Sequence, residues 1–214
     1  MRNFLIFVVV LLVAYVGYLI LDPVPPLQAP AVATSAAISA PAAGPLPETQ
    51  LSTMIKGSLV SMNGRPYTFP ANASAESIQY YAIYYSAQWC PPCHHFSPLL
   101  VDWYTKFKPT HPNFELIFVS EDHDKDSMLS YMDEMLMPWP AVDFDKLSHD
   151  GNGTFRGSGI EQYAGSGIPD LVFVDASGKV LSDSFQAGTY VGPEVVVNDI
   201  NRIIGGSSPI QLAQ

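Results

Sequence analysis

Three short runs of the chain are rich in β-branched and aromatic side chains, the pattern of buried strands. They occupy residues 82–86, 114–119 and 171–174. A helical pattern separates the first run from the second. This order predicts that those two strands are parallel, because a strand–helix–strand connection returns the chain in the same direction.

Apolar residues at spacings of three and four predict three helices. The first covers residues 97–108 and ends at Pro109. The second begins at a cap formed by Asp126 or Ser127 and runs to Met137, before Pro138. The third helix covers residues 193–204 and is ended by glycines.

Two hairpins are also predicted. The first spans residues 59–69 and turns at Asn63-Gly64, a sequence that suits a two-residue β-turn. The second pairs residues 171–174 with residues 180–184 as antiparallel strands. Strands and helices therefore alternate, which predicts an α/β domain with a central mixed sheet flanked by helices.

The N-terminal region follows a different pattern. Residues 4–21 form an unbroken run of 18 uncharged, mostly apolar residues, preceded by Arg2. A helix of this length covers about 27 Å, close to the thickness of a bilayer's hydrocarbon core. We expect an uncleaved signal anchor, a transmembrane helix over residues 1–22. The alternative is a cleaved signal peptide with its site near Ala31-Val32-Ala33, which would give a secreted protein.

Charge predicts the orientation of this segment. Arg2 lies on one side of it, whereas the next basic residue on the other side is Lys56. The positive-inside rule then places the N-terminus in the cytoplasm and the rest of the chain in the periplasm or outside the cell. Residues 23–47, rich in Pro and Ala, are predicted to be an extended linker to a domain at residues 48–214.

Composition narrows the class of function. The chain of 214 residues has 20 acidic and 10 basic residues, a formal net charge of −10. Nucleic-acid binders present basic faces, so we expect no nucleic-acid partner. No cofactor motif occurs, and we expect neither a cofactor nor a bound metal.

The chain's only two cysteines, Cys90 and Cys93, lie three residues apart where a predicted strand gives way to a helix. A helix N-terminus stabilises a thiolate through its unpaired N–H groups and its dipole. Pro91 and Pro92 suit a first helical turn, which needs no N–H from them. We therefore predict a redox-active dithiol in which Cys90 attacks and Cys93 resolves.

Two alternative roles for this cysteine pair stay open. A purely structural disulfide would close a loop so short that little entropy is removed from the unfolded chain. Half of a zinc site would need a second ligand pair, and the five histidines are not paired at finger-like spacing. The residue pattern favours the redox-active dithiol over both of these roles.

The segment Trp89-Cys90-Pro91-Pro92-Cys93 resembles the tryparedoxin and nucleoredoxin branch of the thioredoxin superfamily. Residues 137–144 are similar to a second segment of that branch, and Gly167-Ile168-Pro169 to the superfamily's proline loop. The resemblance covers roughly residues 54–204. It implies a thioredoxin fold with Pro169 in the cis form, facing the dithiol. It also implies that the backbone of Ile168 pairs with an extended substrate.

The resemblance raises three further expectations. Thioredoxins proper carry a buried acid six residues before the first cysteine; here Tyr84 stands there, so Tyr84 or water would have to handle the proton of the resolving thiol. Trp89 would shield one side of the dithiol. His94, if protonated near Cys90, would favour the thiolate; two exposed helix histidines without a role, His94 and His95, are the alternative.

These observations predict a membrane-anchored, extracytoplasmic thiol–disulfide oxidoreductase that reduces protein disulfides. Its partners would be protein substrates, an upstream thiol electron donor, and the membrane through residues 4–21. The alternative is a peptide-binding module of thioredoxin fold that undergoes no redox turnover. Peroxidase activity is a third hypothesis, for which the sequence shows no selective peroxide pocket.

Overall fold

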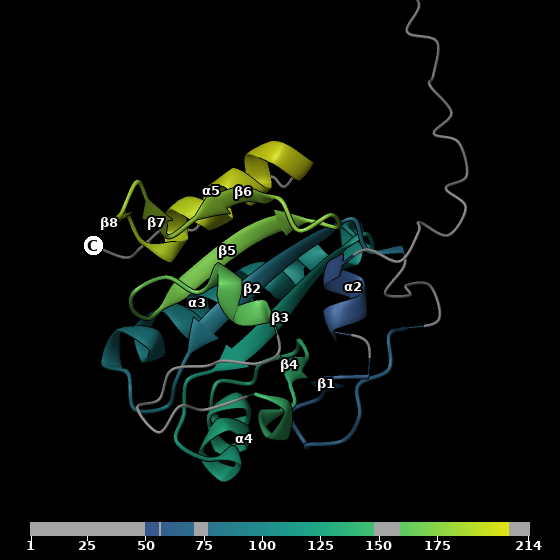
Figure 1. Cartoon of the computed structure of the whole chain (residues 1–214), viewed down its shortest axis with the longest axis vertical. Helices are drawn as coiled ribbons and strands as arrows, with labels where there is room; N and C mark the ends of the chain where they lie inside the picture. Colours follow the sequence, from purple (N-terminus) through teal and green to yellow (C-terminus); the bar gives the residue numbers. More distant parts are fainter. Residues whose placement is uncertain (1–49, 56, 71–76, 148–158, 206–214) are drawn as a thin grey trace, which may run out of the picture. The chain divides into compact units, whose positions relative to one another are not determined.

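A computed structural model describes residues 50–55, 57–70, 77–147 and 159–205 (Figure 1). The predicted anchor at residues 1–22 and the predicted linker at residues 23–47 lie outside this described part. None of the described helices is both long enough and apolar enough to cross a membrane.

A mixed six-stranded sheet forms the centre of the fold, in the order β1-β4-β3-β2-β5-β6. The parallel pairs are β2 with β3 and β3 with β4, and the other neighbours are antiparallel. Its strands are β1 (Leu59–Val60), β2 (Tyr80–Ser86), β3 (Phe114–Ser120), β4 (Ala141–Val142), β5 (Asp170–Asp175) and β6 (Val180–Asp183). The predicted core strands and the parallel pairing are confirmed.

Helices and a small hairpin complete the described fold (Figure 1). The α-helices are α2 (Gln50–Ile55), α3 (Pro91–Phe107), α4 (Lys125–Glu134) and α5 (Pro193–Ile204). Short 3₁₀ helices are η2 (Lys108–Thr110), η3 (Phe144–Lys146) and η4 (Ile160–Tyr163). A separate two-stranded sheet joins β7 (Phe185–Gln186) to β8 (Thr189–Tyr190).

The pleat of β2 divides its side chains between two hydrophobic clusters. Ala82 and Tyr84 join the cluster formed with α3, α4 and α5. Tyr81, Ile83 and Tyr85 join the cluster formed with α2 and η4. Because alternate side chains of a strand point to opposite faces, both faces of β2 are buried, and this accounts for its continuously apolar sequence.

Three predicted helix boundaries are wrong. Helix α3 begins at Pro91 rather than near residue 97, because the two prolines fit the first turn and Pro98 is accommodated inside the helix. The cap of α4 is Asp124, whose carboxylate accepts the N–H of Ser127 at 2.8 Å. This helix ends at Glu134, since Leu136 has a φ of 55° that an α-helix does not allow.

The predicted hairpins are confirmed to different extents. Strands β5 and β6 pair as expected, and α5 has the predicted bounds, ending at Gly205 with a φ of 91°. The Asn63-Gly64 turn is present, with a φ of 72° at Gly64. Its second arm is reduced to one bridge between Val60 and Pro66, while the other edge of β1 pairs with β4.

Candidate functional site

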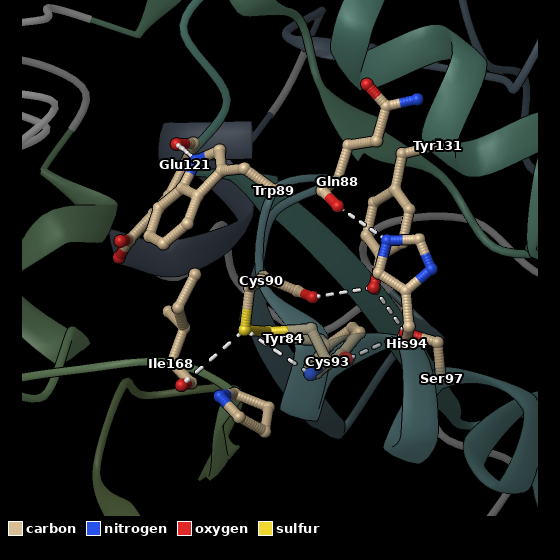
Figure 2. Close-up of a disulfide and its surroundings, with 12 residues drawn as sticks. Tyr84, Gln88, Trp89, Cys90, Cys93, His94, Ser97, Glu121, Tyr131 and Ile168 are labelled. Atoms are coloured by element: carbon tan, nitrogen blue, oxygen red, sulfur yellow. Dashed lines mark hydrogen bonds between the residues drawn. A yellow bond between two sulfur atoms is a disulfide. The ribbon is translucent and has the colours of Figure 1, made fainter.

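The dithiol lies where β2 ends and α3 begins, as the strand–helix junction predicts. Cys90 and Cys93 are joined in a disulfide, and Cys90 is the N-cap residue of α3. Its Sγ accepts the backbone N–H of Cys93 at 3.3 Å (Figure 2). In the reduced state, the same N–H and the helix dipole stabilise a Cys90 thiolate. Pro91 and Pro92 form the exposed first turn.

The two cysteines differ in exposure. Cys90 keeps 3% of its surface accessible, whereas Cys93 keeps none. Only Cys90 therefore offers any surface to a substrate disulfide. This difference favours Cys90 as the attacking thiol and Cys93 as the resolving one, because access limits thiol–disulfide exchange.

The loop before β5 lies opposite Cys90. The Ile168–Pro169 peptide bond is cis, as predicted. The carbonyl oxygen of Ile168 lies 3.8 Å from Cys90 Sγ in the disulfide (Figure 2). After reduction, this oxygen is available to accept a hydrogen bond from the Cys90 S–H. Pro169 is buried and the Ile168 side chain is half-buried, so the loop forms an apolar wall of the site.

Trp89 forms the exposed rim of the site. Its side chain is 53% exposed, and its indole N–H donates to the carbonyl of Glu121 at 3.0 Å. The ring stacks on His123, with 6.2 Å between ring centroids. Trp89 is thus fixed beside Cys90 by the segment that follows β3, while most of its ring remains available for contact.

Tyr84 lies in a buried network of four hydroxyl groups (Figure 2). Its hydroxyl is 2.8 Å from Ser97 Oγ, Ser97 is 2.7 Å from the Tyr131 hydroxyl, and Tyr131 is 2.9 Å from Ser86 Oγ. Burial, reinforced by Tyr131, holds the pKa of Tyr84 well above its ordinary value of 10. Tyr84 therefore stays protonated and can donate a hydrogen bond but cannot act as a base.

His94 makes contacts away from the sulfur atoms. Its Nε2–H donates to the carbonyl of Gln88 at 2.5 Å, and its Nδ1 lies 3.9 Å from Glu134. The ring packs against Tyr131, with 5.1 Å between centroids. In Figure 2 the imidazole points away from the disulfide. These contacts favour a role in holding the first turns of α3 against α4 rather than direct thiolate stabilisation.

Asp122 positions the loop before the dithiol, a role that the sequence motifs did not reveal. One carboxylate oxygen accepts the backbone N–H of Gln88 at 2.7 Å, and the other accepts the Ser120 hydroxyl at 2.7 Å. The signal in the sequence that could have revealed this role was a triplet of polar residues directly after a core strand. The carboxyl ends of parallel strands meet at one edge of a sheet, so this triplet had to lie near Cys90.

Two carboxyl groups near the proline loop have raised pKa values. Burial, with a contribution from Asp170, raises the pKa of Glu121 to about 7. Burial also raises the pKa of Asp170 to about 7, with a contribution from Asp183. Asp170 is fully buried; one oxygen accepts the N–H of Gly165 at 2.7 Å, and the other has no hydrogen-bond partner. Perturbed carboxyl groups cluster at functional sites.

The chemistry available at this site is disulfide exchange. A dithiol at a helix N-terminus, with one accessible sulfur and an apolar wall opposite, is suited to forming and resolving a mixed disulfide. Within the described ranges, no three His, Cys, Asp or Glu side chains are grouped closely enough to hold a metal ion.

Comparison with known proteins also indicates a thioredoxin-like domain. Residues 78–180 match the family described as Thioredoxin-like. Human nucleoredoxin is 34% identical over 140 residues, which are 65% of this chain and 28% of that protein. Tryparedoxin of Trypanosoma brucei brucei is 39% identical over 66 residues, 31% of this chain and 44% of that protein. The chain thus spans less than half the length of these relatives.

Solved structures show the same fold. Tryparedoxin I from Leishmania major superimposes with a TM-score of 0.51 over 74% of this chain and 98% of that one, at 21% identity. The predicted thioredoxin fold is therefore confirmed for the described part. Residues 78–180 thus match the Thioredoxin-like family, and the chain is similar to nucleoredoxins and tryparedoxins.

Proposed function

We propose that the whole chain is a membrane-anchored, extracytoplasmic oxidoreductase that reduces disulfides of protein substrates through Cys90 and Cys93. The observation that carries this proposal is the position of Cys90. It caps α3, it is the more exposed of the two cysteines, and it contacts the proline loop at Ile168. A binding module without redox turnover has no need of a sulfur in this position.

The reaction balances within the dithiol and its substrate. The Cys90 thiolate attacks one sulfur of the substrate disulfide, forming a mixed disulfide and releasing one substrate thiolate, which takes a proton. The Cys93 thiolate then attacks Cys90, releasing the second substrate thiol and leaving the Cys90–Cys93 disulfide. The substrate is reduced by two electrons, and an upstream thiol donor returns two electrons to the dithiol.

Trapping experiments with the full chain test the assigned roles. Cys93→Ser keeps the attacking thiol and lacks the resolving one, so it should accumulate mixed disulfides with substrate proteins. Cys90→Ser, the matched control, should trap few. Preferential trapping by Cys90→Ser would reverse the assignment. Failure of the wild-type protein to reduce insulin would favour the binding module.

The anchor is proposed from residues 4–21 alone, an apolar run of 18 residues preceded by Arg2. Full-length protein should remain in the membrane fraction after a carbonate wash, and its thioredoxin-like domain should be accessible to protease from outside. Release of a product beginning near Thr34 would show a cleaved signal peptide and a secreted protein instead.

A further inference from the structure

Asp170 closes the proline loop from within. It is the first residue of β5, it directly follows Pro169, and none of its surface is exposed. One of its carboxylate oxygens accepts the backbone N–H of Gly165 at 2.7 Å. A Cβ atom at Gly165 would lie 2.9 Å from that oxygen, so glycine permits this close approach. Ile168, whose carbonyl oxygen faces Cys90, lies between the two residues that this bond joins.

The rest of the Asp170 carboxyl group is not neutralised. Its second oxygen is buried without a hydrogen-bond partner, and the ion pairs of the described residues bring no cation to it. Tyr85 lies opposite Asp170 in the register of β2 and β5, but its hydroxyl donates to the carbonyl of Ile160 at 2.5 Å. The Tyr190 hydroxyl of β8 donates to the carbonyl of Pro169. A buried carboxyl group left in this way destabilises a fold, and such groups are typical of functional sites.

Two further carboxyl groups lie around Asp170 on neighbouring elements. Asp183 of β6 pairs with Val172, which is on the same face of the sheet as Asp170 because the two residues are two apart on one strand. The N–H of Glu121 donates to the carbonyl of Ser86 at 2.8 Å, at the end of β2 that borders Asp170. The end of the sheet beside the proline loop is therefore acidic.

These carboxyl groups lie close enough to influence Cys90. The Ile168 carbonyl oxygen is 3.8 Å from Cys90 Sγ, and Asp170 follows two residues later, which places its carboxyl group on the order of 10 Å from the sulfur. In Figure 2, Glu121 lies on the same side of the disulfide as Ile168. A carboxylate at this distance disfavours a thiolate, whereas the N-terminus of α3 favours it. The two sides of the site therefore act on Cys90 in opposite directions.

We propose that Asp170 is a positioning residue for the dithiol. Its carboxyl group closes the proline loop through Gly165, and its negative charge, with that of Glu121, opposes the Cys90 thiolate. Burial, reinforced by neighbouring carboxylates, raises the pKa of Asp170 and of Glu121 to about 7. The opposition is therefore absent well below pH 7, where both groups carry protons, and grows as the pH rises through 7. This inference rests on the proposed disulfide reductase function and names the groups that set the reactivity of its attacking thiol.

The pH dependence of alkylation tests the effect of the charge. Cys93→Ser leaves Cys90 as the only thiol of the full chain, and its reaction with iodoacetamide follows the thiolate fraction. In this background, Asp170→Asn keeps an acceptor oxygen for the Gly165 N–H and removes the charge. The midpoint of the alkylation profile should fall by about 0.5–1 pH unit, the size expected for two like charges about 10 Å apart. Glu121→Gln should lower the midpoint by less, because Glu121 is partly exposed.

Asp175→Asn is the matched control for this measurement. Asp175 ends β5, at the opposite end of the strand from Asp170, and its carboxylate likewise accepts a backbone N–H, that of Ser177, at 2.9 Å. This substitution should leave the midpoint for Cys90 unchanged. An equal fall in Asp175→Asn and Asp170→Asn would show a general effect of the acidic surface and overturn the specific role of Asp170. A midpoint that Asp170→Asn does not move also overturns that role.

Hydrogen exchange tests the closure of the loop. Asp170→Ala removes both the charge and the acceptor, so the Gly165 N–H should exchange with deuterium about tenfold faster than in the wild-type protein. Asp170→Asn should keep this rate within about twofold of the wild-type rate. Because only the asparagine holds the loop, kcat/KM for insulin reduction should be about fivefold lower in Asp170→Ala than in Asp170→Asn. An unchanged exchange rate at Gly165 in Asp170→Ala would overturn the closure.

The role of Asp170 and the proposed function can fail separately. Alkylation and hydrogen exchange need no protein substrate, so they test Asp170 even if the wild-type protein fails to reduce insulin, a result that overturns the proposed function. If insulin is reduced while alkylation and exchange are the same in the variants as in the wild-type protein, the proposed function stands and the role of Asp170 is overturned.

Discussion

Glu115 and Asp170 are both wholly buried carboxyl groups on the central sheet, and each has one oxygen without a hydrogen-bond partner, but only Glu115 has a cation beside it. Glu115 accepts the Tyr104 hydroxyl at 2.5 Å, and Lys108 Nζ lies 3.2 Å from its other oxygen. Asp170 has one bond from Gly165 and an oxygen without a hydrogen-bond partner, and the described ion pairs bring no cation to it.

This difference follows position in the fold. Glu115 lies near the start of β3, away from the dithiol, where a buried charge is tolerable only when it is compensated. Asp170 follows Pro169 directly, at the end of the sheet that carries Cys90. A carboxyl group kept without a compensating cation holds a raised pKa, which is typical of functional sites and costly for stability.

The largest loss of stability is expected when Glu115 loses its compensating cation. Lys108→Met leaves Glu115 buried without its cation and should lower the free energy of unfolding by about 3 kcal/mol, measured by urea denaturation. Lys106→Met is the control, because its partner Asp102 is an exposed i,i+4 neighbour and the expected loss is below about 0.5 kcal/mol. Equal losses in the two variants would show that Glu115 does not depend on Lys108.

A smaller, pH-dependent effect is expected at Asp170. The folded protein holds its proton up to about pH 7, whereas an unfolded aspartate releases it near pH 4. The folded state therefore binds more protons between these values, and the free energy of unfolding falls as the pH rises through this window.

Asp170→Asn removes this pH-dependent loss of stability, because asparagine does not ionise. The Tm at pH 8 should rise by about 3–6 °C relative to the wild-type protein, while at pH 4 the two should be similar. Glu121→Gln should have the same sign with a smaller size, because Glu121 is partly exposed. A Tm of Asp170→Asn that falls at pH 8 would show that the ionised carboxylate stabilises the fold.

The smallest effect concerns Tyr84. Tyr84→Phe removes one buried hydrogen bond to Ser97 and should lower the free energy of unfolding by about 1 kcal/mol. Because the phenol stays protonated, the pH dependence of disulfide reduction between pH 6 and 9 should keep its midpoint. A midpoint displaced by one pH unit would show that Tyr84 takes part in the proton transfer after all.

Local sequence was enough for the elements that carry the dithiol. The only two cysteines, the prolines between them and the change from a strand pattern to a helical one placed Cys90 correctly at a helix N-terminus. Gly167-Ile168-Pro169 identified the opposite wall through a family resemblance. The predicted helix boundaries were wrong where a capping side chain, rather than the spacing of apolar residues, set the end of the helix, as with the Asp124 cap of α4.

Tertiary structure alone decided what surrounds the dithiol. Tyr131 meets Ser97 and Ser86 from 34 and 45 residues away, and Tyr190 reaches Pro169 across 21 residues. Hydrophobic periodicity shows which face of an element is buried, but not which distant element lies against that face. That choice depends on how the sheet and its helices pack as a whole, because only the packed core fixes the distances between hydroxyl and carbonyl groups.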